Sequence, residues 1–250
     1  MNIKKLVRTD IIKQKRGLLW LIIFIIPLGT TVAMFLDMYL RYEDFLYHSI
    51  KKQGVTSWEM LLIENHALLQ WGKFLPIFVA VIGAVVYQIE FKQSSWTTLL
   101  SLPVTKSSVF ISKFITIMIV SALLICLNTI GLIVVGIIIG FPEAVDIGLY
   151  SKYVINQCIA ILGVAALHNW LSSYLRNMVI PVAIGFIGMI LSSIIFSQIP
   201  AKAKFFPYLY PYLIAGQKEI NPSIVLYSGL ASGVIILLLG IIEFQRRDIS

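Results

Sequence analysis

Side chains able to carry out acid–base or metal chemistry are few in this sequence and lie far apart. A histidine beside a carboxylate can activate water for hydrolysis, and His168 with Glu243 offers such a combination. A histidine in an apolar run without an acidic partner more often makes a hydrogen bond between helices, and we favour that interpretation of His168. Glu64 and His66 cannot hold a metal alone, because zinc needs three or four ligands. A hydrolase therefore stays open only as an alternative.

The sequence also lacks the motifs of common enzyme classes. Its only Gly-Lys pair, Gly72-Lys73, is followed by Phe74, where a phosphate-binding loop needs a serine or threonine. No nucleophile elbow, paired-histidine zinc helix or paired-cysteine pattern occurs. Cys126 and Cys158 fall in apolar runs, as small core residues do. We expect no catalysis in this chain and no metal or cofactor bound by it.

The composition places the chain in a membrane. Of 250 residues, 58% are apolar and 13% are charged, with a mean hydropathy of +0.89; a soluble domain has about a quarter of its residues charged. Continuous apolar runs approach or exceed the roughly 20 residues that a helix needs to cross the hydrocarbon layer. We predict an all-α polytopic membrane protein with one domain over residues 1–250. Its six transmembrane helices are expected at 18–36, 68–87, 109–139, 153–175, 178–199 and 224–242.

Residues 1–17 are predicted to form an interfacial helix ahead of the first span. Apolar residues share one face and basic residues crowd the rest, as in helices that lie on anionic membrane surfaces. The apolar face comprises Ile3, Leu6, Val7 and Ile11. The alternative is a disordered basic tail. The apolar run that follows is too long for a signal peptide and has no small-residue cleavage site, so we expect an uncleaved first span.

The charge distribution predicts the orientation. Six spans place both termini on one side of the membrane, and twelve of the 20 basic residues but only four of the 12 acidic residues fall on that side. Since basic residues are enriched in cytoplasmic segments, we expect both termini in the cytoplasm. The net charge of +8 therefore concerns orientation and not nucleic acid, which we do not expect as a partner.

The longest polar interruption on the basic side is Tyr87–Lys113, and it predicts a short amphipathic helix at residues 88–104. Trp96, Leu99 and Leu100 recur at helical spacing and so share a face. Pro103 ends this helix, because a proline disfavours helical geometry in the residue before it. Ser107 or Ser108 can then cap the next helix. Such a segment would act as a rigid lever between two spans; the alternative is a plain connecting loop.

Three patterns predict local structure elsewhere. The run Thr56-Ser-Trp-Glu59 fits a capping box and should begin a helix. Trp58 and Trp71 suit an aromatic belt at the membrane interface. Residues 200–222 are rich in proline and aromatic residues, which favours a re-entrant or interfacial hairpin over a soluble loop.

Small and amide residues within the spans predict contacts between helices. Asn128 should make a hydrogen bond to a neighbouring helix. Glycine pairs at helical spacing can let helices approach closely in lipid. These pairs are Gly136…Gly140 and Gly229…Gly233.

The stretch Tyr87–Lys113 also carries residues that resemble a known family. In chain order they are Glu90, Trp96-Thr97, Leu99-Leu100, Leu102-Pro103-Val104-Thr105-Lys106 and Lys113. This order resembles the signature of type-2 ABC exporter permeases: a glutamate, a short helix, a leucine-x-proline-valine-(serine/threonine)-basic turn, and a lysine that opens the third span. Size, span number, the basic N-terminal helix and the proline–aromatic segment extend the resemblance over the whole chain. Family members usually carry a glycine-threonine pair where this chain has Ser95-Trp96.

The resemblance implies that residues 88–104 form a coupling helix seated on a separate cytoplasmic ABC ATPase, which would bind ATP and Mg²⁺. The implied ATPase-coupling residues are Glu90, Trp96, Leu99, Leu100, Pro103, Lys106 and Lys113. A second permease subunit, identical or homologous, would complete a dimer.

The function that the resemblance implies is ATP-driven export, from the membrane or the cell, of an amphipathic or hydrophobic substrate. Within the family the likeness is to permeases that protect Gram-positive bacteria from lantibiotics or bacitracin, or that export amphipathic peptides. We therefore expect the plasma membrane of a bacterium, with membrane lipids and an amphipathic peptide or lipid-like substrate as partners. The alternatives are an intramembrane hydrolase and a non-transporting membrane anchor or sensor.

Overall fold

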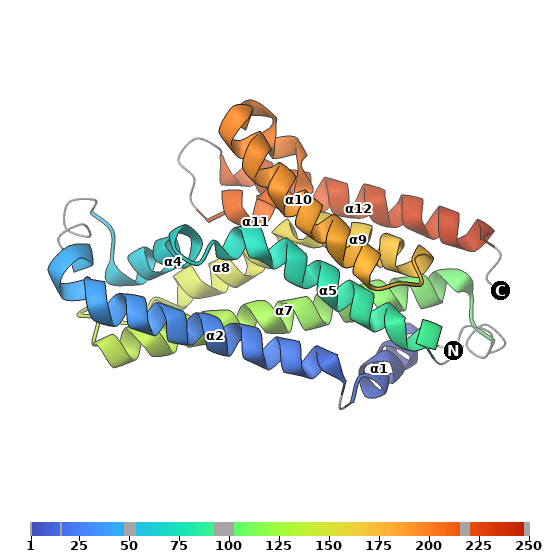
Figure 1. Cartoon of the computed structure of the whole chain (residues 1–250), viewed down its shortest axis with the longest axis horizontal. Coiled ribbons are helices and arrows are strands. Elements are labelled where there is room, and N and C mark those ends of the chain that lie inside the picture. Colours follow the sequence, from blue (N-terminus) through green and yellow to red (C-terminus); the bar gives the residue numbers. More distant parts are fainter. Residues whose placement is uncertain (1, 16, 48–53, 93–102, 216–220, 248–250) are drawn as a thin grey trace.

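The computed structural model describes residues 2–15, 17–47, 54–92, 103–215 and 221–247, and in these residues the fold is all helical, without strands. The helices form an elongated bundle with both chain termini at the same end (Figure 1). Five of the helices are long and apolar enough to cross a membrane, and a bent helix pair brings the number to as many as six. The predicted all-α membrane fold is confirmed.

The principal helices follow the predicted order. They are α1 (Ile3–Lys13), α2 (Leu18–Arg41), α4 (Ser57–Ala67), α5 (Trp71–Lys92), α7 (Lys106–Ile139), α8 (Ile147–Ala160), α9 (Leu162–Tyr174), α10 (Val179–Gln198), α11 (Tyr210–Leu213) and α12 (Pro222–Arg246). A π-helical turn, Tyr42–Leu46, follows α2, and two 3₁₀ turns, Pro200–Phe205 and Pro207–Leu209, precede α11.

Helix α5 and the 34-residue α7 carry most of the central core. Helix α5 continues to Lys92, beyond the predicted end at residue 87, and α7 begins at Lys106, before the predicted start at 109. Residues 88–92 therefore extend the second span and are not part of a separate helix. By contrast, α2, α10 and α12 leave most of their apolar surface exposed, as membrane-facing helices do.

The predicted fourth span, 153–175, is two helices. Helices α8 and α9 meet at Ile161 with a bend of 40°. Helix α12 crosses this junction closely: a Cβ atom on Gly229 would lie 2.9 Å from the Ile159 carbonyl oxygen, and one on Gly233 would lie 2.7 Å from Leu162 Cβ. This glycine pair therefore allows the predicted close approach.

The other glycine pair does not join two long helices. A Cβ on Gly136 would lie 2.4 Å from the Trp58 ring, so this glycine makes room for a side chain. Gly140 ends α7 in the left-handed conformation with φ of 82°, which glycine adopts at little cost. The prediction of close helix packing at this pair was wrong, because the second glycine is a helix cap.

At the end opposite the termini, α4 begins with the predicted capping box. The Thr56 hydroxyl accepts from the Glu59 amide, and the Glu59 carboxylate accepts from the Thr56 amide at 2.8 Å. Trp58 and Trp71 are both buried, so the prediction of an aromatic belt for them was wrong. Trp58 packs between aromatic rings and donates to the Glu143 carbonyl at 2.9 Å, which supplies its polar partner inside the protein.

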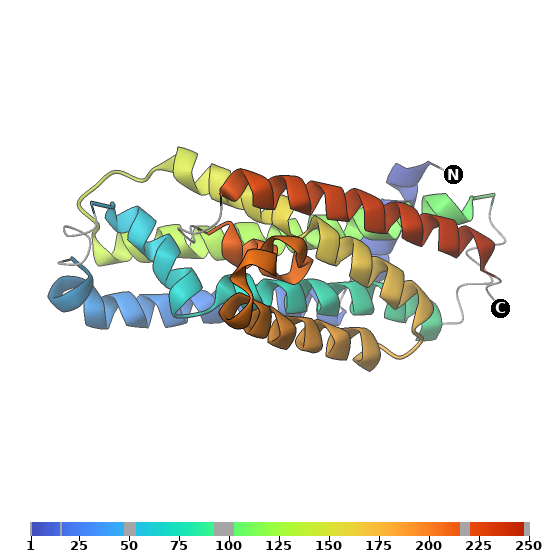
Figure 2. The same ribbon diagram turned by 90° about the horizontal axis from the view of Figure 1, so that it is seen from above.

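The proline–aromatic segment that begins at Pro200 folds into short helical turns within the bundle. Tyr208, Leu209 and Tyr210 are buried, and the turns contact α5, α10 and α12. In Figure 2 this orange segment lies between α10 and the start of α12. The part from Tyr208 to Leu213 is thus packed in the core, whereas Phe205 before it is exposed.

Candidate functional site

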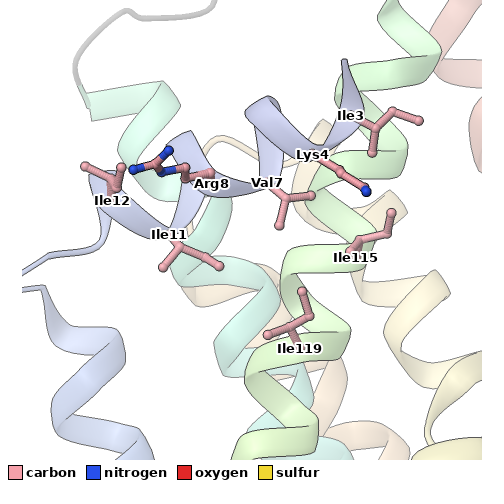
Figure 3. A pocket seen from close by; sticks show the side chains of 8 residues that line it. All are labelled: Ile3, Lys4, Val7, Arg8, Ile11, Ile12, Ile115 and Ile119. Atoms are coloured by element: carbon pink, nitrogen blue, oxygen red, sulfur yellow. The ribbon is translucent and has the colours of Figure 1, made fainter. Parts of the chain in front are cut away.

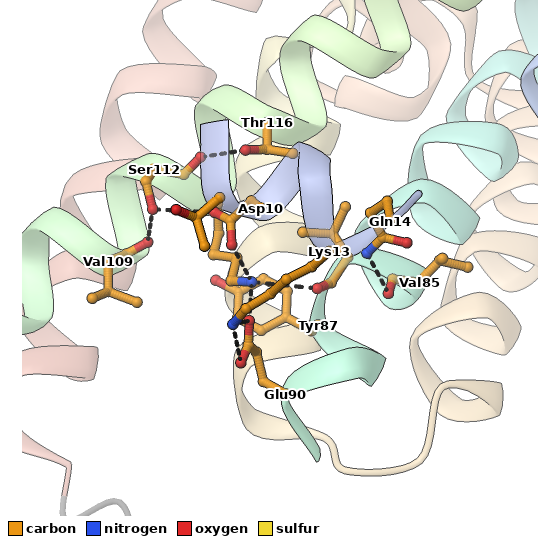
Figure 4. A network of polar contacts seen from close by, with 12 residues as sticks. Asp10, Lys13, Gln14, Val85, Tyr87, Glu90, Val109, Ser112 and Thr116 are labelled. Atoms are coloured by element: carbon orange, nitrogen blue, oxygen red, sulfur yellow. Dashed lines mark hydrogen bonds and ion pairs between the residues drawn. The ribbon is translucent and has the colours of Figure 1, made fainter. Parts of the chain in front are cut away.

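A cluster of buried charges lies at the end of the bundle that carries the termini (Figure 4). We call it the charged cluster; it comprises Asp10, Lys13, Glu90 and Lys113. Three elements supply it: the second half of α1, the last turn of α5 and the start of α7. Glu90 and Lys113 are 0% and 1% exposed, so the cluster is inside the protein although every member is ionisable.

Lys113 is the centre of the charged cluster. Its Nζ lies 2.7 Å from Asp10 Oδ1 and 2.8 Å from Glu90 Oε1, and it also reaches the Val86 carbonyl at 3.5 Å. One ammonium therefore joins carboxylates from two different helices. The Ser112 hydroxyl lies 3.4 Å from the second oxygen of Asp10, so that carboxylate is held through both oxygens.

Lys13 balances the second carboxylate. Its Nζ lies 2.8 and 3.0 Å from the two oxygens of Glu90, and its side chain is 27% exposed. Two ammonium groups thus face two carboxylates. This balance is required, because a buried charge without a partner is very costly. One residue on, Gln14 Nε2 donates to the Val85 carbonyl at 3.4 Å and adds a further link between α1 and α5.

The local sequence explains why α7 can present Lys113 to the cluster. Thr105 is extended, and its hydroxyl accepts from the Ser108 amide at 3.2 Å, so Thr105 is the N-cap. The prediction that Ser107 or Ser108 caps the helix was wrong, because Pro103 fixes the break early enough for the helix to begin at Lys106. Lys113 then lies two turns inside α7, at the level of Glu90 on the neighbouring α5.

Neutral hydrogen bonds extend this cluster to α9. The Tyr87 hydroxyl donates to Asn169 Oδ1 at 3.0 Å, and Asn169 Nδ2 donates to the Phe110 carbonyl at 3.4 Å. Tyr87 also packs beside Lys113, whose Nζ lies 5.8 Å from its ring centroid. The ends of α5 and α7 are therefore joined to each other, to α1 and to α9.

The sequence was also compared with known protein families. Over residues 6–192, which is most of the chain, the sequence matches a family described as ABC-2 family transporter protein. The chain belongs to the ABC-2 transporter family. It is thus a multi-pass membrane protein and the permease component of an ABC-2 transporter, which works with a separate ABC ATPase and is not itself catalytic. A search among curated proteins gave no match to the permease.

The structure brings two of the predicted coupling residues together and places two others apart. Glu90 and Lys113 are paired and buried, so neither presents its charge on the surface. Lys106 instead donates to the carbonyl groups of Gln245 and Arg247 at the end of α12. Pro103 is exposed, just before α7. The remaining predicted residues, Trp96, Leu99 and Leu100, lie outside the described residues.

Sequence reasoning missed the contribution of α1 to the permease site. Asp10 and Lys13 are members of the charged cluster, although α1 was expected only to lie on a membrane surface. A signal was present: Asp10 is the one acid among the basic residues of residues 1–17. Leu6, Asp10 and Gln14 recur every four residues and form the buried stripe of the helix. An acid in such a stripe needs a cation on the element that covers it.

The two residues of the hydrolase alternative have different partners in the permease. His168 Nε2 lies 2.7 Å from the Tyr208 hydroxyl, which confirms the structural hydrogen bond that we favoured. Glu243 pairs with Arg247 and accepts from Trp170 Nε1 at 3.1 Å. Among the residues described, no group of three or more potential metal-ligating side chains occurs.

A second polar cluster lies between α2, α4, α7 and α8, and we call it the neutral cluster. Its members are Thr30, Asn65, His66, Asn128, Tyr153 and Gln157. Asn128 donates to the Thr30 hydroxyl at 3.0 Å and accepts from Asn65 at 3.3 Å, which confirms its predicted contact between helices. His66 Nε2 lies 2.9 Å from the Tyr153 hydroxyl. Burial lowers the pKa of His66 to about 3, so this histidine is uncharged at neutral pH.

Proposed function

We propose that the permease exports an amphipathic or hydrophobic substrate, and that residues 88–104 couple it to the ATPase in the cytoplasm. The observation that carries the proposal is the charged cluster. Lys92 and Pro103 flank the part of the coupling segment that lies outside the described residues, and Glu90 and Lys113 pair just inside those two flanks. Asp10 and Lys13 fasten α1 to the same pair.

This geometry favours transmission of force. A buried ion pair with short contacts resists separation, because parting the ions would leave uncompensated charges in a dry interior. A push on residues 93–102 would therefore move the ends of α1, α5 and α7 together. The end of α5 and the start of α7, which flank the coupling segment, lie at the end of the bundle that carries both termini (Figure 1). The excess of basic residues supports a cytoplasmic position for this end.

The exposed surfaces support the kind of substrate that we propose. Helices α2, α10 and α12 present long apolar faces, with residues such as Phe24, Leu28 and Ile190 more than half exposed. Such faces can contact lipid, a second permease subunit or a greasy substrate. An antimicrobial peptide of the lantibiotic type would fit, because its apolar side needs apolar walls.

The test combines purification with an activity measurement. The permease is extracted in mild detergent with its ATPase, and ATP hydrolysis and export of an amphipathic peptide are measured in proteoliposomes. We expect Leu99→Glu and Leu100→Glu to leave membrane insertion intact but to abolish export, because a charge on the predicted docking face disfavours burial against the ATPase.

A matched control is Ile147→Glu, which places the same charge on an exposed aliphatic residue at the start of α8, a helix that supplies none of these three apolar faces. This control should keep ATP hydrolysis coupled to export. Normal coupling in both coupling-segment variants would contradict the role proposed for residues 88–104. Intact coupling with no peptide export would contradict the substrate class alone.

A further inference from the structure

A groove of about 390 Å³ lies between α1 and α7, on the side of the protein (Figure 3). Its walls are aliphatic: α1 supplies Ile3, Val7, Ile11 and Ile12, and α7 supplies Ile115 and Ile119. Ile12 and Ile119 are about half exposed, at 57% and 46%. The groove has the size of a small-ligand site and nearly no polar wall.

Two basic side chains border the groove, with the apolar parts of their chains against it. Lys4 and Arg8 lie one turn apart on α1, and both are exposed. No described carboxylate forms an ion pair with either residue, whereas Lys13 and Lys113 nearby are paired with Glu90 and Asp10. Uncompensated positive charge therefore adjoins an apolar groove on a membrane protein.

We propose that this groove binds one anionic phospholipid. An acyl chain lies against the isoleucines, and the phosphate of the headgroup is held by Lys4 and Arg8. The charge selects the headgroup, because basic side chains near a membrane attract anionic lipids. The walls select the chain, because burying methylene groups stabilises the bound state. Neither a free anion nor a purely apolar molecule uses both halves of the site.

The bound lipid would brace α1 from a side next to the charged cluster. Asp10 faces α7 through Lys113, while Val7 and Ile11 line the groove. Lipid and ion pair would thus hold one helix to α7 on two faces. Lipid binding in this groove depends neither on the ATPase nor on the identity of the exported substrate.

The test uses the full chain, purified in mild detergent and depleted of lipid. Phosphatidylglycerol or phosphatidylcholine is added, and bound lipid is counted by native mass spectrometry alongside the thermal midpoint. We expect saturable binding of phosphatidylglycerol with a raised midpoint. The double variant Lys4→Gln/Arg8→Gln should weaken that binding about 25-fold, from about fivefold for each basic side chain lost.

The matched control is Lys5→Gln/Lys15→Gln, which removes the same charge from exposed positions that do not line the groove. It should bind phosphatidylglycerol as the unchanged protein does. Ile119→Phe narrows the groove and should weaken binding with every charge retained, and Ile119→Ala serves if the larger side chain impairs folding.

Three results would overturn the proposal. Equal weakening in both double variants would mean general attraction to a basic helix. Equal binding of phosphatidylcholine would mean that Lys4 and Arg8 do not select the headgroup. An equal rise in thermal midpoint with inorganic phosphate would mean that a free anion is sufficient.

Discussion

The charged cluster and the neutral cluster both lie between helices, yet their polar atoms are paired to different degrees. Every ionised group of the charged cluster has a partner of opposite charge within 3.0 Å. In the neutral cluster, His66 Nδ1, Asn65 Oδ1 and Gln157 Oε1 have no hydrogen-bond partner among the described residues. The difference follows from the free energy of burial. Burying an unpaired amide costs about 1–3 kcal/mol, whereas burying an unpaired ion costs far more. We therefore expect the charged cluster to be the less tolerant of change.

The largest effect is expected for Lys113→Met, which keeps an unbranched side chain, shorter by one atom, but removes the central ammonium. Asp10 and Glu90 would then remain as two buried carboxylates with only Lys13 beside them. Removing one partner of a buried ion pair costs about 3–5 kcal/mol. We expect a large drop in the thermal midpoint of the detergent-solubilised protein.

The control for this change is Lys5→Met, which removes an exposed ammonium of α1. Its thermal midpoint should stay within the error of the measurement. A Lys113→Met protein as stable as that control would mean that the paired geometry adds nothing to stability.

The next largest effect is a partial recovery of stability when the Asp10 carboxylate is neutralised together with the Lys113 ammonium. In Lys113→Met/Asp10→Asn, the remaining carboxylate of Glu90 still has Lys13, whose ammonium contacts both of its oxygens. The double variant should therefore be more stable than Lys113→Met alone. The coupling energy between the two positions should be about 1–3 kcal/mol. Unfolding of the single variants and the double variant gives this coupling as a double-mutant cycle. Additive losses would show that Asp10 and Lys113 act independently.

The sequence predicted the helices better than it predicted either cluster. Long apolar runs predict helices through their length alone, so most of the predicted spans overlap one long helix, although 153–175 covers parts of α8 and α9. The pairing of Lys113 with Asp10 joins residues about a hundred positions apart, and nothing in the local sequence specifies that distance. Trp58 shows the same limit. The local sequence does not distinguish an interfacial tryptophan from a buried one, because the carbonyl group that accepts from Trp58 belongs to the distant Glu143. The family signature identified Glu90 and Lys113 but not their partners on α1.

A smaller effect should come from pH, through His66 in the neutral cluster. Burial lowers the pKa of His66 to about 3, so the unfolded chain binds a proton below about pH 6.5 that the folded protein does not bind. Stability should fall as the pH drops from about 6.5, by at most about 1.4 kcal/mol for each pH unit.

The pH effect is isolated by comparing the unchanged protein with His66→Gln between pH 5 and pH 8. Burial raises the pKa of the neighbouring Glu64, but both proteins contain that group, so its contribution cancels in the difference. The difference in thermal midpoint should change below pH 6.5 and be constant above it. A constant difference over the whole range would mean that His66 is protonated in the folded protein as readily as in the unfolded chain.

The smallest effect tests whether hydrogen bonds in the neutral cluster stabilise the protein at all. Asn128→Leu removes the bonds to Thr30 and Asn65, and we expect a loss of about 1 kcal/mol, since such bonds between membrane helices are weak. Ser121→Ala is the matched control on the same helix, because the Ser121 hydroxyl is buried and has no partner among the described residues. Its removal should be neutral or slightly stabilising, because no bond is lost and a buried polar group is removed. If the two variants shift the thermal midpoint equally, burial and not hydrogen bonding governs the neutral cluster, and the contrast with the charged cluster is one of charge alone.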